Sequence, residues 1–367
     1  MKTRNYLWAM LAAATLSLTA CGGEENENTE PKPQGKTAEL EISVLGTSSS
    51  NTKSTGTLPG TNDEDKIQRI AVAVFNSDGS VNTISESTTS TSSISINCTP
   101  AAGCSGVAVA NAPANAFAGV TTKTAFLAKT VTLKQTATEL PMSGEIKDKT
   151  TSANTFTLTA GSTTTVKVEL TRMVARVSIS SIKTAFDPAG QYSKATFKAK
   201  QIFMHNAKTT SNVDPGTLTT TALKTGWDDA SVAADHVATL KDDISGGGVA
   251  ITGTAYTTPY WFYTFPNNNT TSTRLVIRGD FDPDGSGSVI ASDVYYPVVV
   301  NLAQTGTSIN SGAKDGTIAR NTTYAITATI KGKGAPNPNT NMVPATLDLT
   351  VTVAAWALNI TQDVEFN

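Results

Sequence analysis

The stretch TAELEISVL, residues 37–45, shows most clearly which fold the sequence predicts. Its apolar residues alternate with two glutamates and a serine. Side chains at every second position of a β-strand point to the same face, so this spacing predicts a strand with one buried face. The residues expected on that face are Ala38, Leu40, Ile42 and Val44.

The same pattern recurs along the chain as short runs rich in valine, isoleucine and threonine, separated by glycine, asparagine, aspartate, serine and proline. Such runs between turn residues are typical of strands. Helical periodicity is weak and is confined to residues 121–131. We predict strands at residues 37–45, 67–75, 106–110, 155–159, 164–170, 173–179, 260–265, 274–279, 295–301, 323–330 and 347–353.

The predicted fold class is all-β, with two β-sandwich-like domains of mostly antiparallel sheet in a Greek-key or transthyretin-like arrangement. The 367 residues are enough for two domains of ordinary size. We place the boundary within LTRMVAR, near residue 172. The predicted segments are an N-terminal domain at 54–172, a C-terminal domain at 173–344 and a terminal strand segment at 345–367.

The first residues, MKTRNYLWAMLAAATLSLTAC, have the features of a bacterial lipoprotein export signal. Lys2 and Arg4 precede an apolar run that is too short to span a bilayer and that ends in small residues. We therefore expect residues 1–20 to be a signal peptide, cut between Ala20 and Cys21, with lipid on Cys21. An ordinary secretory signal, in which Cys21 carries no lipid, is the alternative.

Residues 21–53 are expected to form a polar tether, the first strand and the start of a Ser/Thr-rich linker. The linker, GTSSSNTKSTG at 46–56, is accessible to proteases by its composition, and Lys53 is its only trypsin-type site. Lys66 and Arg69 are competing sites. Arg69 falls inside the next predicted strand, which would protect it.

The composition argues against nucleic-acid binding and catalysis. Only 16% of the residues are charged and the net charge is −2, so the chain has no basic stripe to hold a phosphate backbone. His205 and His236 are far apart in sequence, and neither has an acidic or cysteine partner at ligand spacing. The sequence contains no G-x-S-x-G, H-E-x-x-H or G-x-x-x-x-G-K-[ST]. We expect no catalytic residue and no cofactor.

The segment DFDPDGSGS at 280–288 has the alternating acidic oxygens of a calcium loop. However, Ala291 stands at the position where a bidentate acid belongs. A solvated hairpin turn between the flanking strands is the favoured interpretation, and no metal is assigned.

Cys98 and Cys104 flank a five-residue loop. In an oxidising compartment these cysteines can form a disulfide, and two free thiols are the alternative.

Aromatic residues gather between Tyr256 and Phe265. Exposed rings in such a run can stack on sugars. A place in the core is favoured, because the run continues a predicted strand.

The last predicted strand also alternates and then changes phase, which implies a bulge or a handover between faces. Its apolar residues are Leu347, Leu349, Val351 and Val353, followed by Trp356, Leu358 and Ile360. The turn-rich stretch at 332–339 precedes it and predicts a hinge from which the segment can lift away. Alternatively, the strand completes the sheet of its own domain.

Several segments together resemble the fimbrillin family, the FimA-like major subunits of type V pili in Gram-negative bacteria. The resemblance covers most of the chain and rests on the order and spacing of the lipoprotein signal and six further segments. These are EISVLGTSSSNTKSTG, DKIQRIAVAVFNSDG, LTRMVARVSISSI, YPVVVN, IARNTTYAITATIKGKG and VTVAAWALN.

The resemblance implies a maturation route. A lipidated precursor in the outer membrane reaches the surface, and a trypsin-like protease cuts between Lys53 and Ser54. The first strand then leaves with the lipid, and the C-terminal strand of a neighbouring copy replaces it. The family implies a homopolymeric fimbrial stalk, accessory anchor and tip subunits, and a role in adhesion and biofilm formation.

Physical reasoning supports strand replacement. A lost strand leaves an apolar groove with unpaired backbone that needs another strand. The alternative function is a monomeric surface lipoprotein that binds a host ligand or glycan through its loops and keeps its first strand.

Overall fold

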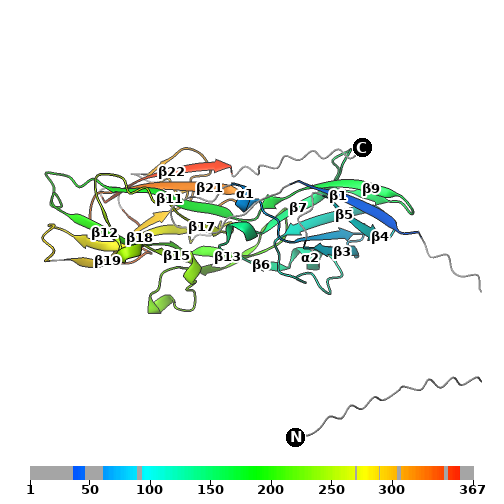
Figure 1. Ribbon diagram of the computed structural model, residues 1–367, viewed down its shortest axis with the longest axis horizontal. Helices are drawn as coiled ribbons and strands as arrows, with labels where there is room; N and C mark the ends of the chain where they lie inside the picture. Colours follow the sequence, from blue (N-terminus) through cyan, green and yellow to red (C-terminus); the bar gives the residue numbers. More distant parts are fainter. Residues whose placement is uncertain are drawn as a thin grey trace, which may run out of the picture. The chain divides into compact units, whose positions relative to one another are not determined.

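The computed structural model describes residues 36–45, 61–88, 93–268, 271–288, 290–303, 307–342 and 346–355 (Figure 1). The described strands and helices all lie in one compact unit, residues 37–367. Ala20, Cys21, Lys53, Ser54, Trp356, Leu358 and Ile360 lie outside the described residues.

Among the described residues, nine strands form the first sheet, in the order β3-β2-β5-β7-β9-β1-β4, with β8 paired to β5 and β10 paired to β7. All neighbours are antiparallel except β1 and β9, which are parallel. The strands are β1 (Ala38–Leu45), β2 (Ile70–Phe75), β3 (Val81–Ser87), β4 (Ser93–Cys98), β5 (Ala101–Ala110), β7 (Met142–Asp148), β8 (Phe156–Leu158), β9 (Thr163–Glu169) and β10 (Thr171–Arg172).

Two further sheets, each of five described strands, pack face to face. One has the order β17-β11-β21-β22-β20, and the other has β15-β12-β18-β19 with β16 paired to β12. Val177 and Ile326 from the first of these sheets share a core with Phe197 and Ile277 from the second. The strands are β11 (Ala175–Thr184), β12 (Thr196–His205), β15 (Lys241–Asp243), β16 (Val249–Ile251), β17 (Tyr260–Thr264), β18 (Arg274–Asp282), β19 (Ala291–Val299), β20 (Thr307–Ile309), β21 (Thr322–Ile330) and β22 (Leu347–Ala355).

A small sheet and a shared core join segments from the two sides of residue 172. The sheet has the order β14-β13-β6, from β6 (Thr130–Thr132), β13 (Ala207–Asn212) and β14 (Thr220–Lys224). In the shared core, Phe75 lies in one cluster with Trp261. The division into domains at 54–172 and 173–344 remains a prediction, and these contacts cross it.

The described helices are short. They are α1 (Thr61–Glu64), α2 (Lys123–Leu127) and the 3-10 turns η1 (Ala137–Glu139), η2 (Ala230–Val232), η3 (Ala238–Leu240) and η4 (Ser245–Gly247). Helix α2 lies in the region with weak helical periodicity, and Thr122 caps it by accepting a hydrogen bond from Ala125 N. Within the described ranges, no helix is long and apolar enough to cross a membrane.

The all-β prediction is confirmed, and each predicted strand overlaps an observed one. The sheets are mostly antiparallel, with parallel pairs at β1/β9, β11/β21 and β20/β22. The placement of Arg69 inside a strand was wrong, because β2 begins one residue later. Arg69 instead precedes β2, and its Nη1 lies 3.5 Å from Oε2 of Glu86 on β3 in an ion pair.

Candidate functional site

Strand β1 occupies an interior position in the first sheet, between β9 and β4. It pairs with β9 over residues 39–45 and with β4 over residues 38–43 (Figure 1). The side chains that alternation places on one face are at most 4% exposed and belong to one core cluster. They are Ala38, Leu40, Ile42 and Val44. The sequence therefore predicted correctly which face of β1 is buried.

Strand β4 is terminal in the order of the sheet, and β1 is its neighbour there. Without β1, β9 and β4 would be separated by about two strand spacings, roughly 9 to 10 Å, with unpaired backbone on both sides. The end of β4 has a second attachment. Asn82 Nδ2 donates to the Thr99 carbonyl at 2.9 Å, and Asn82 Oδ1 accepts from Thr99 N at 2.9 Å. This contact gives β4 a tie to β3 that does not depend on β1.

Helix α1 follows the linker that contains Lys53, and the acidic side chains at its end are buried in an ionic cluster. Arg176 Nη1 donates to both carboxylate oxygens of Glu64 at 2.9 Å, and Tyr263 Oη donates to Oε1 at 2.9 Å. Arg172 pairs with Asp65, and its Nε donates to the Glu64 carbonyl at 3.1 Å. Glu64 and Arg172 are fully buried. Through this cluster, the residues that directly follow the linker are bound to β10, β11 and β17.

Burial dominates the electrostatics of this cluster. It raises the pKa of Glu64, while Arg176 and the hydrogen bond from Tyr263 oppose the shift. Burial also lowers the pKa of Arg172, against the attraction of Asp65 and Glu64. Buried charges are compatible with a stable fold only when each has a partner, so removal of one partner lowers the free energy of unfolding. This cluster could not be recognised from sequence, because the run NDEDK at 62–66 has the composition of a solvated surface segment.

The C-terminal strand β22 lies between β21 and β20 and contributes to the core between the two five-stranded sheets. It is antiparallel to β21 over residues 347–355 and parallel to β20 over residues 349–351. Leu347, Leu349, Val351 and Val353 are at most 8% exposed. In the single chain the strand therefore completes its own sheet, which is one of the two arrangements that the sequence left open.

The segment before β22, which the sequence predicted as a hinge, is docked on β12, β18 and β19. Ala335 exchanges two backbone hydrogen bonds with Tyr295, at 2.7 and 2.9 Å. His205 Nε2 lies 2.9 Å from Asn339 Oδ1, and Arg274 Nη2 donates to Asn341 Oδ1 at 2.7 Å. These contacts hold residues 335–341 against the three strands.

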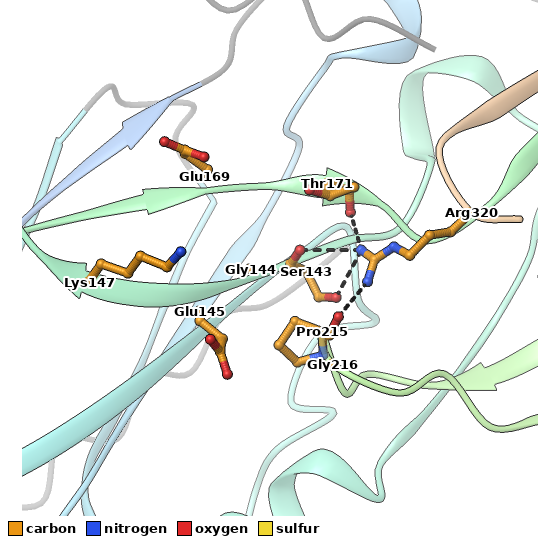
Figure 2. Close-up of a pocket in the computed structure, with 9 residues that line it drawn as sticks. All are labelled: Ser143, Gly144, Glu145, Lys147, Glu169, Thr171, Pro215, Gly216 and Arg320. Atoms are coloured by element: carbon orange, nitrogen blue, oxygen red, sulfur yellow. Dashed lines mark hydrogen bonds between the residues drawn. The ribbon is translucent and has the colours of Figure 1, made fainter. Parts of the chain in front are cut away.

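A cavity of about 360 Å³ opens near the end of β1, where Leu45 pairs with Glu169 (Figure 2). Arg320 extends toward it and donates to the carbonyls of Thr171 at 2.7 Å and Pro215 at 2.9 Å. Burial lowers the pKa of Arg320 to about 10. The lining residues are Ser143, Gly144, Glu145, Lys147, Glu169, Thr171, Pro215, Gly216 and Arg320.

Arg320 acts in this cavity as a structural bridge. Its hydrogen bonds go to neutral oxygens, and they join the turn before β21 to β7, β10 and the turn at residue 215. Gly144 is required beside it, because a Cβ there would lie 2.3 Å from the Glu169 carbonyl. The side chains that line the cavity carry both signs of charge, and we assign it no ligand.

The aromatic run lies in the core, as favoured from sequence. Tyr260, Trp261, Phe262, Tyr263 and Phe265 are all at most 3% exposed. Tyr256 is half-buried, and its hydroxyl lies 3.0 Å from that of Tyr260. These rings are therefore not a platform for a glycan.

Cys98 and Cys104 are buried free thiols in the structure. Their sulfurs face different carbonyls, Cys98 Sγ toward Ile96 at 4.0 Å and Cys104 Sγ toward Ala101 at 3.5 Å. Burial, with a smaller contribution from Cys104, raises the pKa of Cys98 to about 11.

The segment 280–288 connects β18 and β19 as a hairpin, as predicted. Asp282 is turned onto the backbone of this loop. Its Oδ1 accepts from Gly285 N at 3.0 Å, and its Oδ2 accepts from Gly287 N at 2.7 Å. Within the part of the chain that the structure describes, no three His, Cys, Asp or Glu side chains are grouped to hold a metal ion.

Two protein-family models match the chain. The model of the major fimbrial subunit protein FimA matches residues 38–172, and that of the FimA4 pilin C-terminal domain matches residues 284–356. Together these matches cover more than half of the chain. A search of curated protein sequences found no match.

Solved structures show the same fold. A fimbrilin (FimA) from Porphyromonas gingivalis W83 has a TM-score of 0.64 and 20% identity, over 89% of this chain and 99% of that one. A putative cell adhesion protein from Bacteroides eggerthii DSM 20697 has a TM-score of 0.62 and 23% identity, over 88% and 97%. One from Parabacteroides distasonis ATCC 8503 has a TM-score of 0.64 and 19% identity, over 89% and 99%. The chain belongs to the fimbrillin family of FimA-like major fimbrial subunits and is a structural subunit of a cell-surface pilus.

Proposed function

We propose that the protein is a stalk subunit of a type V pilus and that it polymerises by strand exchange. In this proposal, β1 is removed by proteolysis and the C-terminal strand of a neighbouring copy takes its place. The observation that carries the proposal is the position of β1, an interior strand with a buried apolar face that lies N-terminal to the Lys53 linker. A single cut after Lys53 separates this strand from the rest of the chain.

The energetics favour replacement over an empty groove. At about 1.5 to 3 kcal/mol per large side chain, the buried face of β1 contributes roughly 5 to 10 kcal/mol. This is comparable with the stability of a whole domain, so a subunit without β1 needs another strand. Strand β22 has a matching pattern of four buried apolar residues at alternate positions. Its insertion into a second copy would pair the open backbone of β9 and β4.

Repetition of this contact gives a filament. The donor and acceptor surfaces are different parts of the chain, so the interface is heterologous, and such contacts continue indefinitely unless they close into a ring. Lipid on Cys21 would hold the precursor in the outer membrane, and a cut after Lys53 would release lipid and β1 together. Accessory anchor and tip subunits would complete the fibre, which would support adhesion and biofilm formation. The role is structural and non-catalytic.

The maturation step is tested on the intact precursor with trypsin as the protease. We expect the wild type to give polymers that begin at Ser54 and that run as a ladder in detergent gels before boiling. Lys53→Ala should stay monomeric, whereas the matched variant Lys66→Ala should polymerise. Equal polymerisation of Lys53→Ala, or recovery from cells only of an acylated monomer that begins at Cys21, would contradict the proposal.

The donor role is tested by deletion of residues 345–367. The truncated protein should be secreted and cleaved but should form no polymer. Normal fibres from this variant would exclude the C-terminal strand as the donor.

A further inference from the structure

Strand β22 is held unequally on its two sides. On one side, β21 pairs with it along all nine residues, from Leu347 to Ala355. On the other side, the described residues of β20 pair with three residues, Leu349 to Val351. The side chains after β20 extend this shorter contact toward the C-terminal end of β22.

Asn310 extends this contact, because its side-chain amide makes the two hydrogen bonds that the backbone of a paired strand residue would make. Its Oδ1 accepts from Val353 N at 2.7 Å, and its Nδ2 donates to the Val353 carbonyl at 3.1 Å. Ser311 Oγ donates to the same carbonyl at 2.9 Å. Gly312 follows with φ +89, and a Cβ there would lie 3.5 Å from a Val353 methyl group and 3.2 Å from Asn301 Oδ1. Three consecutive residues thus gather around Val353.

The contact at Val353 lies near the C-terminal end of β22, where it can limit how often this strand opens. Among the described residues, Ala354 and Ala355 follow Val353 and pair with β21 alone. When β22 opens from its C-terminal side, Val353 is the first of its described residues that is held on both sides. Local opening is governed by the few contacts that must break together, so these hydrogen bonds set a threshold for release.

We propose that Asn310 and Ser311 form a latch that closes on Val353 and sets how often the C-terminal strand opens. Both act as positioning residues for the strand. The latch is a property of the single chain. Its role in assembly rests on the proposed function, because only a strand that is donated needs to be released.

The latch is tested by hydrogen–deuterium exchange on the uncleaved full-length protein. Asn310→Ala removes two of the three hydrogen bonds, so we expect exchange in residues 347–355 to be about tenfold faster or more. Ser311→Ala removes one bond and should have a smaller effect. Asn310→Asp keeps the acceptor but loses the donor, and it should also have an intermediate effect. Ser308→Ala is the matched control, because this exposed β20 residue pairs with β22 through its backbone.

Hydrogen–deuterium exchange in β12 and β18 distinguishes a local effect on β22 from a change in the stability of the whole protein. These strands should exchange at the wild-type rate in every variant. Unchanged exchange of β22 in Asn310→Ala would overturn the latch, and so would an equal rise in β12, β18 and β22.

A second measurement separates the latch from the proposed function. After cleavage, Asn310→Ala should polymerise faster than the wild type and Ser308→Ala. If β22 exchanges faster but polymerisation is unchanged, the latch stands and the result counts against β22 as the donor. If the wild type forms no polymer after cleavage, the proposed polymerisation by strand exchange is wrong. The hydrogen–deuterium exchange rates of β22 still test the latch in that case.

Discussion

Ile42 of β1 pairs with Val166 of β9 in a parallel ladder, and both side chains are fully buried. Across β1, the same isoleucine lies opposite Ile94 of β4 in an antiparallel ladder. A residue from the segment that we propose is discarded therefore lies in the interior of the first sheet, between β9 and β4. The precursor and the assembled subunit should consequently differ in which substitutions destabilise them.

Replacement of Ile42 by alanine should lower the free energy of unfolding of the precursor by about 2 to 5 kcal/mol, because it leaves a cavity in the core. Fibres from the same variant should match wild-type fibres in stability, since they no longer contain residue 42. Chemical denaturation of the two forms measures both effects. Ser43→Ala is the control, and its outward, half-buried position predicts a change within about 0.5 kcal/mol. Fibres weakened by Ile42→Ala would show that β1 is retained.

Replacement of Arg172 by alanine should destabilise the protein by about 3 to 5 kcal/mol, because it leaves Asp65 as a buried charge without this partner. Arg69→Ala is the matched control, since it breaks the partly exposed pair with Glu86 and should cost less than about 1 kcal/mol. Denaturant titration at neutral pH compares the two. Similar losses for both variants would contradict the importance assigned to the ionic cluster.

Cys98 and Cys104 should resist alkylation in the folded protein. Both are buried, and the raised pKa of Cys98, about 11, leaves little of the reactive thiolate at pH 8. Iodoacetamide should therefore modify them only in denaturant, without need of a reductant, as measured by mass spectrometry of the peptide that contains both. Modification in denaturant only after reduction would show that the disulfide forms.

Alternation within a strand could be recognised from sequence, whereas contacts between distant segments could not. The period of two identified the buried faces of β1 and β22, because it depends only on neighbouring residues. It could not indicate that β1 pairs with β9, more than a hundred residues away, or that Arg172 meets Asp65. Strand β12 was missed because its register shifts between Ala199 and Gln201, which interrupts the alternation.

His205 should make stability depend on pH. Its Nδ1 lies 2.9 Å from Thr225 Oγ1, and its Nε2 lies 2.9 Å from the carbonyl oxygen of the Asn339 side chain, an acceptor that requires Nε2 to carry a proton. Burial lowers the pKa of His205 below 6.5, and Arg274 adds to the shift against the hydrogen bond to Asn339. The folded state therefore holds the ring neutral at pH values where the unfolded chain already binds a proton.

Because the folded pKa is the lower one, the stabilisation is complete above about pH 6.5 and is lost as the pH falls from there toward the folded pKa. The free energy of unfolding of the wild type should decrease between pH 7 and pH 5. His205→Gln cannot titrate, so its free energy of unfolding should be lower at pH 7 but should decrease less over this range. If the free energy of unfolding fell equally with pH in both proteins, His205 would not be the group responsible for the pH dependence. Since Asn339 lies in the segment that leads to β22, the protection factors of residues 335–341, which correct for the intrinsic pH dependence of amide exchange, should also be lower in the wild type at pH 5 than at pH 7. Such a decrease would link protonation of His205 to undocking of this segment.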